Sequence, residues 1–121
     1  MAPKPVCMTR LVRPGHLNSN GNLFGGQLMK WIDEASFIAA TRYAHEKMVT
    51  VSVDKISFKK PVSEGSIVEI NTLVESNNGI KLAVHTEVTA ELPGVNVKTL
   101  AAEAWFSFAC VDENDQPQRI K

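Results

Sequence analysis

The sequence of 121 residues predicts an α+β fold in which a five-stranded antiparallel sheet is wrapped around one long central helix. Two observations predict this fold. Only residues 25–47 have the 3.6-residue periodicity of a long helix, and the four segments that follow alternate with the two-residue period of strands. A further strand-like segment precedes the helix. At this length we expect residues 1–121 to form a single domain with one core.

The first predicted element is a strand from Val6 to Val12. Pro14 and Gly15 then mark a turn, because this dipeptide is typical of chain reversals. A polar loop from His16 to Asn22 follows. Asn22 stands shortly before the helix and has a side chain suited to cap it.

The helix is expected to begin at Gly25 and to end near Lys47. At 100° per residue it has one broad apolar face. This face holds Leu28, Trp31, Ile32, Ala35, Ile38, Ala39 and Tyr43. The sector around Asp33 holds Met29, Phe37, Ala40 and Ala44. One small sheet cannot cover both faces, so we expect the Asp33 sector to face a second copy of the chain in a C₂ homodimer.

Four strands are predicted after the helix, at residues 49–58, 67–74, 80–91 and 95–111. Turn signals separate them, at residues 61–65, at Asn78-Gly79 and at Pro93-Gly94. Asn-Gly accepts positive φ and favours a hairpin. Because no second helix intervenes, we expect consecutive strands to run antiparallel.

The composition excludes several classes of function. The 13 basic and 13 acidic residues balance, so no broad attraction to nucleic acid or to an anionic membrane is expected. The longest apolar runs fall short of the roughly 20 residues of a spanning helix. Cys7 and Cys110 have no CxxC partner and are expected to be buried free thiols. We therefore expect a cytoplasmic protein.

Asp33 and Glu34 are neighbours with different surroundings. Glu34 shares a polar strip with Lys30, four residues earlier, and is expected to be a solvated, ion-paired acid. Asp33 lies too far into the helix to cap it, and its helical neighbours are apolar. A carboxylate there is costly unless it is paired or functional, so Asp33 is a candidate for acid–base chemistry. The alternative is an acid bonded to a backbone amide or to a cation of the partner chain.

Gly25 and Gly26 begin the helix although glycine costs about 1 kcal/mol against alanine inside one. They leave bare N–H groups at the positive end of the helix dipole, which can hold a carbonyl oxygen or an anion. The sequence has no GxGxxG or GxxxxGK[ST] motif, so an oxyanion hole is a better match than a nucleotide site. The same glycines would also let the helix pack close to a strand.

The remaining polar candidates carry weaker signals. His16, His45 and His85 do not have the spacing of metal ligands with each other or with the cysteines, so no metal site is predicted. Lys60 ends a predicted strand, where it could hold a phosphate.

The segment from Asn18 to Ala35 resembles the signature of the hot-dog-fold acyl-CoA thioesterases. It reads Asn18-x-x-Gly21-x-Leu-Phe-Gly-Gly-x-Leu-Met-x-x-Ile-Asp33-Glu-Ala, and it is most similar to the bacterial YciA-type and cytosolic brain-type acyl-CoA hydrolases. The likeness continues through Val49-Thr50-Val-Ser-Val-Asp54, Phe58-Lys-Lys-Pro-Val62 with Gly65, and Phe106-x-Phe-x-x-Val-Asp112.

The resemblance implies an enzyme that hydrolyses the thioester of an acyl-coenzyme A to a carboxylic acid and coenzyme A, without a metal or cofactor. Asp33 is implied as general base or nucleophile, and the amides of Gly25 and Gly26 as the donors that polarise the thioester carbonyl. Asn18 is implied to lie across a dimer interface and to place the thioester or water. The family forms dimers, commonly three in a hexamer, with coenzyme A between subunits.

The resemblance also suggests residues that bind the substrate. Several relatives have a Gly-Arg-Ser-Ser-like run where this chain has residues 78–81, so Lys81 is the candidate there for contact with the phosphates of coenzyme A. The full expected set is Asn20, Phe24, Met29, Phe37, Phe58, Lys60 and Lys81.

Two other functions fit the same fold. A dehydratase or hydratase would need a catalytic histidine near the helix, and none lies between Leu17 and Tyr43. A non-catalytic acyl-CoA binding or sensing module is the main alternative. The sequence leaves open whether Asp33 acts as base or nucleophile, and which acyl-chain length is preferred.

Overall fold

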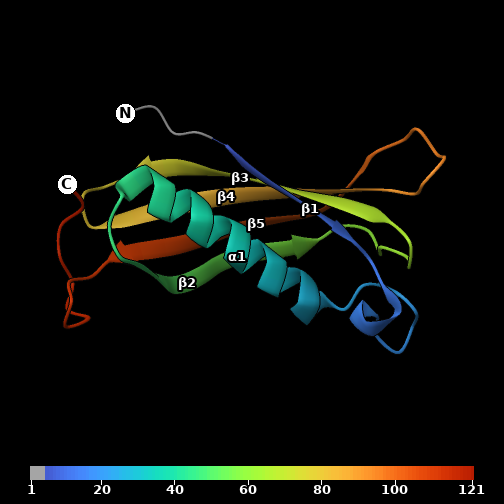
Figure 1. The fold of residues 1–121 in the computed structure, drawn as a ribbon, viewed down its shortest axis with the longest axis horizontal. Helices are drawn as coiled ribbons and strands as arrows, with labels where there is room; N and C mark the ends of the chain where they lie inside the picture. The colour runs from blue at the N-terminus through green and yellow to red at the C-terminus, as the bar shows by residue number, and fades with distance from the viewer. Residues whose placement is uncertain (1–4) are drawn as a thin grey trace.

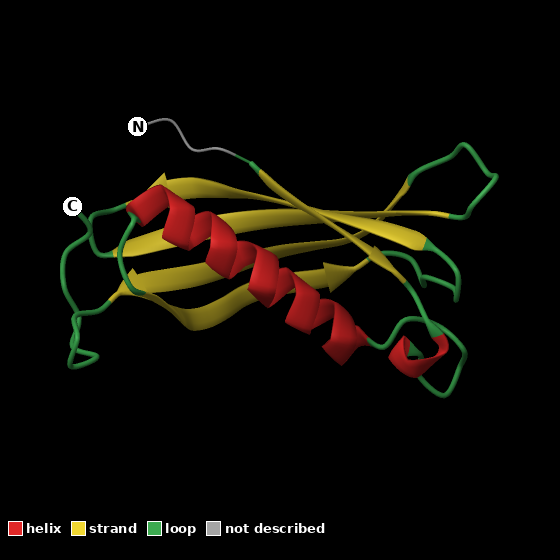
Figure 2. Ribbon diagram, viewed as in Figure 1, coloured by secondary structure: helices red, strands yellow, loops and turns green. Residues whose placement is uncertain are grey.

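Five antiparallel strands form one sheet in the order β1-β3-β4-β5-β2, and the single long helix α1 crosses one face of it (Figures 1 and 2). The structure, a computed structural model, describes residues 5–121. Its elements are β1 (Val6–Leu11), a short 3₁₀ helix η1 (Pro14–His16), α1 (Gly25–Ala44), β2 (Met48–Phe58), β3 (Ile67–Asn77), β4 (Lys81–Glu91) and β5 (Thr99–Cys110). This is the predicted architecture, and β1 and β2 are the two edge strands.

The core lies between α1 and the sheet, because alternate residues of the central strands point toward the helix. Phe106 and Phe108 of β5 are its largest buried side chains. The predicted apolar face of α1 supplies the other half, and its buried members are Leu28, Trp31, Ile32, Ala35 and Ala39. Ile38 and Tyr43 are only partly buried, and Ser36 and Ala40 are buried as well.

A chain of buried hydroxyl groups joins the helix to the sheet. Ser36 Oγ of α1 lies 3.3 Å from Thr86 Oγ1 of β4, and Thr86 Oγ1 donates to Thr72 Oγ1 of β3 at 2.8 Å. The Thr72 hydroxyl in turn donates to the carbonyl oxygen of His85 at 3.3 Å. Buried polar groups need such partners, so this chain favours one position of α1 along the sheet.

Three predicted boundaries are wrong by three residues or more. β3 runs on to Asn77 rather than ending at Val74. The helix ends at Ala44 rather than near Lys47, because His45 takes a left-handed conformation (φ 55°) and its N–H caps the carbonyl of Thr41 at 2.8 Å. The last strand begins at Thr99 rather than Val95, because residues 92–98 form a loop instead.

The edge strand β2 departs from simple alternation. Its pairing with β5 has two irregularities, one after Thr50 and one after Val53. Each irregularity adds one residue to β2 that has no partner in β5. The side chains after it therefore point to the opposite face from the one that strict alternation would give them. As a result Thr50 lies opposite Phe108 and Val53 opposite Phe106, both on the helix side of the sheet.

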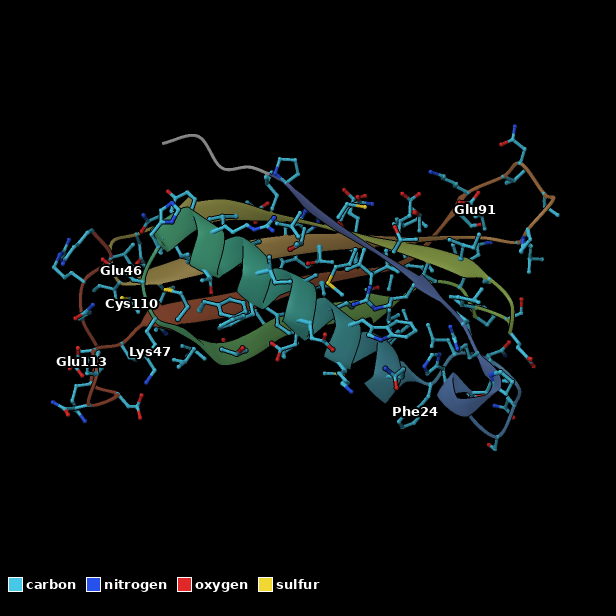
Figure 3. The ribbon with its side chains drawn as sticks, in the orientation of Figure 1. Phe24, Glu46, Lys47, Glu91, Cys110 and Glu113 are labelled. Atoms are coloured by element: carbon cyan, nitrogen blue, oxygen red, sulfur yellow. The ribbon has the colours of Figure 1, made fainter. Side chains whose placement is uncertain are left out.

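Both cysteines are free, as predicted, but only one is buried. Cys7 is exposed, because it lies on the face of β1 that points away from α1, opposite Asn71. Cys110 is buried, with its Sγ 2.6 Å from Glu46 Oε2 (Figure 3). Burial, reinforced by this contact, raises the pKa of the Cys110 thiol. Within residues 5–121, no helix is both long enough and apolar enough to cross a membrane.

Candidate active site

A groove of about 470 Å³ opens at the start of α1. It lies between the loop that precedes the helix and the segment that follows β2. Five of the residues predicted for the site line it: Asn18, Asn20, Gly25, Phe58 and Lys60. Residues 18–28 and 58–62, which are at least 30 positions apart in the sequence, converge here because β2 ends beside the beginning of the helix.

Asn18 organises the loop that forms one wall of the groove. Its side-chain Oδ1 accepts hydrogen bonds from the backbone N–H of Asn20 at 2.9 Å and of Asn22 at 3.1 Å. Its backbone N–H donates to the carbonyl of Asn22 at 2.7 Å, and Gly21 takes a positive φ of 79° within this turn. In the described part of the chain, Asn18 Nδ2 has no hydrogen-bond partner, so it keeps two N–H donors for another group.

The helix begins without a side-chain cap. Phe24 is the N-cap residue in place of the predicted Asn22, and its carbonyl accepts the N–H of Leu28 at 3.1 Å. The N–H groups of Gly25 and Gly26 donate to no acceptor within residues 5–121. They are thus open donors at the positive end of the helix dipole, as the sequence predicted.

Two aromatic rings cover the glycine pair. A Cβ atom on Gly25 would lie 3.4 Å from Phe58 Cζ, and one on Gly26 would lie only 2.6 Å from Phe24 Cε2. The second distance excludes any side chain at position 26 unless the Phe24 ring moves. Phe24, labelled at the start of α1 in Figure 3, is 56% exposed and Phe58 is 53% exposed. Both rings are therefore available to a ligand that approaches the amides.

Asp33 lies two helical turns further along α1 and does not line this groove. Its carboxylate is half-buried and accepts a hydrogen bond from Thr50 Oγ1 at 2.9 Å. Thr50 reaches it because the register of β2 places its side chain on the helix side of the sheet. One carboxylate oxygen is thereby held in place, while Oδ2 has no partner among residues 5–121. Glu34 is exposed and, within the same residues, forms no ion pair with Lys30.

Sequence reasoning gave no role to Thr50. The segment Val49-Thr-Val-Ser-Val53, in which valines alternate with hydroxyl residues, contains a signal for such a role. A hydroxyl group on an edge strand can donate a hydrogen bond to a carboxylate on the neighbouring helix. Strict alternation places Thr50 and Ser52 on one face, however, and the structure separates them. Ser52 Oγ donates to Asp54 Oδ1 at 2.6 Å on the outer face, the face opposite α1. Hydrogen bonds from Ser107 and Ser52 lower the pKa of Asp54.

The other predicted binding residues lie outside the groove. Met29 and Phe37 share the helix sector of Asp33, where Phe37 is 44% exposed. Lys81 begins β4 and lies opposite Ala109, whereas Phe58 lies opposite Ala102, so Lys81 is at the other end of the sheet from the groove. A single chain therefore does not bring Lys81 and Asp33 together with the residues of the groove.

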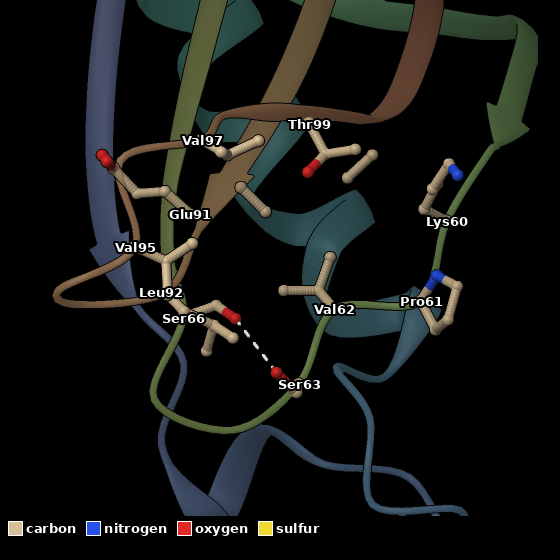
Figure 4. A pocket seen from close by; sticks show the side chains of 12 residues that line it. Lys60, Pro61, Val62, Ser63, Ser66, Glu91, Leu92, Val95, Val97 and Thr99 are labelled. Atoms are coloured by element: carbon tan, nitrogen blue, oxygen red, sulfur yellow. Dashed lines mark hydrogen bonds between the residues drawn. The ribbon is translucent and has the colours of Figure 1, made fainter.

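A second, smaller groove of about 230 Å³ adjoins the first (Figure 4). The two share Lys60, Pro61 and Val62, and the loop that joins β4 to β5 closes the far side of the smaller one. That side is apolar, with Val95 and Val97 both exposed.

Comparison with known proteins identifies the family of the chain. Residues 20–95 match the family described as Thioesterase superfamily, and the chain belongs to this family. A Haemophilus influenzae protein named as an uncharacterized acyl-CoA thioester hydrolase is 33% identical over 122 residues, which cover 97% of this chain and 79% of the relative. The chain spans 19% of the length of mouse acyl-coenzyme A thioesterase 11 and 65% of that of the Bacillus subtilis protein YkhA. The predicted family is confirmed.

Solved structures of relatives have the same hot-dog fold. A hexameric thioesterase from Yersinia pestis superposes with a TM-score of 0.89 at 29% identity, covering 98% of this chain and 96% of that one. An acyl-CoA hydrolase from Staphylococcus aureus, solved with butyryl coenzyme A and coenzyme A, has a TM-score of 0.90 at 28% identity, covering 96% of this chain and 71% of that one. The same hydrolase has been solved as three variants with alanine in place of an aspartate, a threonine and an asparagine.

Proposed function

We propose that the protein is an acyl-CoA thioesterase, which hydrolyses the thioester of an acyl-coenzyme A to a free carboxylic acid and coenzyme A. The observation that carries this proposal is the position of the Asp33 carboxylate. It accepts a hydrogen bond from Thr50 at 2.9 Å, and it lies on a sector of α1 that the sheet of the same chain leaves half-exposed. The open amides at the helix start supply the complementary part, donors for a carbonyl oxygen that gains negative charge.

The spacing of three residues supports the roles assigned to them. In the Staphylococcus aureus hydrolase, the positions changed to alanine are separated by the same intervals as Asn18, Asp33 and Thr50 here. Residues of the same three types at the same spacing, in a fold that superposes closely, favour one shared site. Thr50 therefore joins Asp33 and Asn18 in the proposed machinery, as a residue that positions the carboxylate.

In the reaction, water adds to the thioester carbonyl carbon, and the C–S bond breaks to release the coenzyme A thiol. As general base, Asp33 takes a proton from the attacking water and returns it to the departing sulfur. As nucleophile, Asp33 itself adds to the thioester carbonyl carbon in place of water, and the C–S bond breaks to release coenzyme A as the thiolate; water then hydrolyses the mixed anhydride between Asp33 and the acyl group. In both routes the N–H groups of Gly25 and Gly26 hold the oxygen that becomes negative, and Asn18 Nδ2 orients the thioester or the water.

The proposed active site contains residues from two copies of the chain. Asp33 lies outside the groove that contains Asn18 and Gly25, so a partner must supply the missing half. Exposed apolar side chains border the Asp33 sector: Phe37, Val51 and Val53 are 44%, 46% and 40% exposed. A second copy that covers them would bring its own groove toward Asp33. We propose a dimer of this kind, and the hexameric relatives favour a trimer of dimers.

The substrate contacts follow from this arrangement. Phe24 and Phe58 would pack beside the thioester next to the glycine amides, and Asn20 would line the entry to the groove. The ammonium group of Lys60 is placed to contact a phosphate of coenzyme A. Met29, Phe37 and Lys81 of the partner chain complete the proposed set: the first two along the acyl chain, Lys81 as a second phosphate contact.

We propose that the reaction needs no metal or other cofactor, since carboxylate, amides and water suffice for it. Residues 1–121 would act as one thioesterase domain in the cytoplasm, without nucleic-acid or membrane partners. The two free thiols favour such a reducing compartment.

The test measures coenzyme A release from a panel of acyl-CoAs with a chromogenic thiol reagent. Asp33→Asn is expected to lower turnover by at least about 100-fold, because it removes the base or nucleophile. Asp54→Asn is the matched control, since Asp54 is also held by hydroxyl groups but lies on the outer face, and it should stay within about twofold of the wild type. Binding of acyl-CoA without any turnover in the wild type would instead show a binding module.

The dimer is tested by light scattering of the wild type and of Phe37→Glu. A charge in the centre of the proposed interface should shift the mass toward the monomer and lower turnover with it. A wild-type protein that is monomeric at micromolar concentration and still hydrolyses acyl-CoA would contradict the shared site.

A further inference from the structure

Three side chains with metal-binding atoms gather on the outer face of the sheet, away from α1. His85 and Glu87 are two residues apart on β4 and so point to the same side, and Glu103 on β5 lies directly opposite Glu87. One ligand atom from each residue lies within 4.8 Å of the other two. The pairing of β4 with β5 creates this cluster, which explains why histidine and cysteine spacing in the sequence did not indicate it.

The imidazole of His85 is already oriented toward the cluster. Its ring stacks on Trp105, with 4.7 Å between the ring centroids and 24° between the planes. Its Nε2 lies 2.7 Å from Glu103 Oε2. Both side chains are about three-quarters buried, at 23% and 24% exposure. The stacking and the contact with Glu103 together hold the imidazole in one orientation, with Nε2 toward the two glutamates.

The charges of the cluster are poorly balanced by protein groups. Like charges directly opposite each other on neighbouring strands repel, as Glu87 and Glu103 do here. The residues next to them on β3 and β2, Asn71 and Ser57, are neutral. Among residues 5–121, His85 is the only partner that forms an ion pair with either glutamate. Two lysine ammonium groups lie in the neighbourhood without forming an ion pair with either glutamate. That of Lys55 lies 5.6 Å from the centroid of the Trp105 ring, and that of Lys59 lies 3.5 Å from Ser57 Oγ.

We propose that His85, Glu87 and Glu103 bind a divalent transition-metal cation, with Zn²⁺ as the best match. One imidazole nitrogen and two carboxylates supply three protein ligands, and water would complete the coordination. Bonds of about 2.1 Å require ligand atoms roughly 3.4 Å apart, which rotations of the two flexible glutamate side chains can reach. The cation replaces the proton between His85 and Glu103, relieves the repulsion between the glutamates and links β4 to β5.

This site is independent of the proposed hydrolysis, because it lies on the other face of the sheet from Asp33. Hard cations such as Mg²⁺ prefer all-oxygen ligands and several waters, so the imidazole selects against them. Preference for Zn²⁺ over Mg²⁺ therefore separates a true coordination site from a mere concentration of negative charge.

The experiment is calorimetric titration of the metal-free protein with zinc chloride and, separately, magnesium chloride. One equivalent of Zn²⁺ is expected to bind at least tenfold more tightly than Mg²⁺. His85→Ala, Glu87→Gln and Glu103→Gln should each weaken zinc binding at least tenfold. His45→Ala and Glu75→Gln, which change an exposed histidine and an exposed glutamate elsewhere, should bind as the wild type does.

A second measurement checks that the cluster variants lose zinc binding because a ligand is removed and not because they misfold. Zinc should raise the midpoint of thermal unfolding of the wild type and of both control variants, but not that of the three cluster variants. Circular dichroism should show the same secondary structure in all of them. Absence of a zinc equivalent in the wild type, equal affinity for Mg²⁺, or unchanged zinc binding in the cluster variants would each overturn the proposal.

Discussion

The hydroxyl of Thr50 makes one hydrogen bond in the described structure, to the carboxylate of Asp33. Thr50→Val removes this bond and keeps the shape of the side chain. Valine is at least as favourable as threonine in a strand, so the sheet should tolerate the change. If Thr50 positions the catalytic carboxylate, the variant should fold normally but turn over substrate more slowly.

The size of the effect follows from the bond that is lost. Hydrogen bonds to charged groups contribute about 1.5–3 kcal/mol. Thr50 is exposed in the single chain, where water can replace its hydroxyl, so we take the lower limit, about 1.5 kcal/mol. This corresponds to roughly a tenfold lower kcat, because each 1.36 kcal/mol of barrier is a factor of ten. KM should change little, since Thr50 contacts the carboxylate and not the substrate.

Steady-state coenzyme A release measures kcat and KM for the variant. Thr50→Ser keeps the hydroxyl and should restore most of the activity, and Ser52→Ala removes a hydroxyl from the same strand on the opposite face and should be silent. In an Asp33→Asn background, Thr50→Val should have no further effect, because the two residues act as a unit. A Thr50→Val enzyme within twofold of wild-type kcat would refute the positioning role.

Three further predictions concern other parts of the chain. Hydrogen bonds lower the pKa of Asp54 below its ordinary value of 3.8, so its charge stabilises the fold above that pH, and the stabilisation is lost as the pH falls through the lower folded-state pKa. Urea unfolding should therefore show Asp54→Asn to be less stable than the wild type at pH 7, and the difference should shrink as the pH is lowered below 3.8. Gly26→Ala places a Cβ 2.6 Å from the Phe24 ring, so turnover should fall at least about tenfold while circular dichroism stays unchanged. A thiol reagent should modify exposed Cys7 rapidly and buried Cys110 only in urea; rapid reaction of both in the native protein would contradict the described burial.

The loop and helix of the site could be predicted from the sequence because their signals are local. The glycine pair, the apolar periodicity and the isolated carboxylate of Asp33 all occur within residues 18–35. Local turn chemistry likewise predicted the hairpin at Asn78-Gly79. The helix end was less predictable, because His45 adopts a left-handed conformation that usually favours glycine or asparagine.

The partner of Asp33 could not be predicted in the same way. Thr50 is 17 residues away in sequence, and its contact depends on where β2 pairs irregularly with β5. A one-residue change of register moves every following side chain to the other face, so an unforeseen bulge reverses the assignment of a whole segment. The cluster of His85 and Glu103 was hidden for a related reason, because strand pairing across 18 residues of sequence brings it together.

The separation of the proposed site into two surfaces explains why the helix is apolar around so much of its circumference. One face of α1 packs on its own sheet, and the sector that contains Asp33 and Phe37 remains partly exposed in the single chain. If a second copy covers this sector, the carboxylate of Asp33 becomes desolvated only on assembly, at the same step that brings it to the glycine amides of the partner. Electrostatic interactions gain strength as water is excluded, so association would complete both the geometry and the reactivity of the site. On this argument, variants that weaken the dimer should lose activity in proportion to the fraction of monomer, even when every catalytic residue is intact.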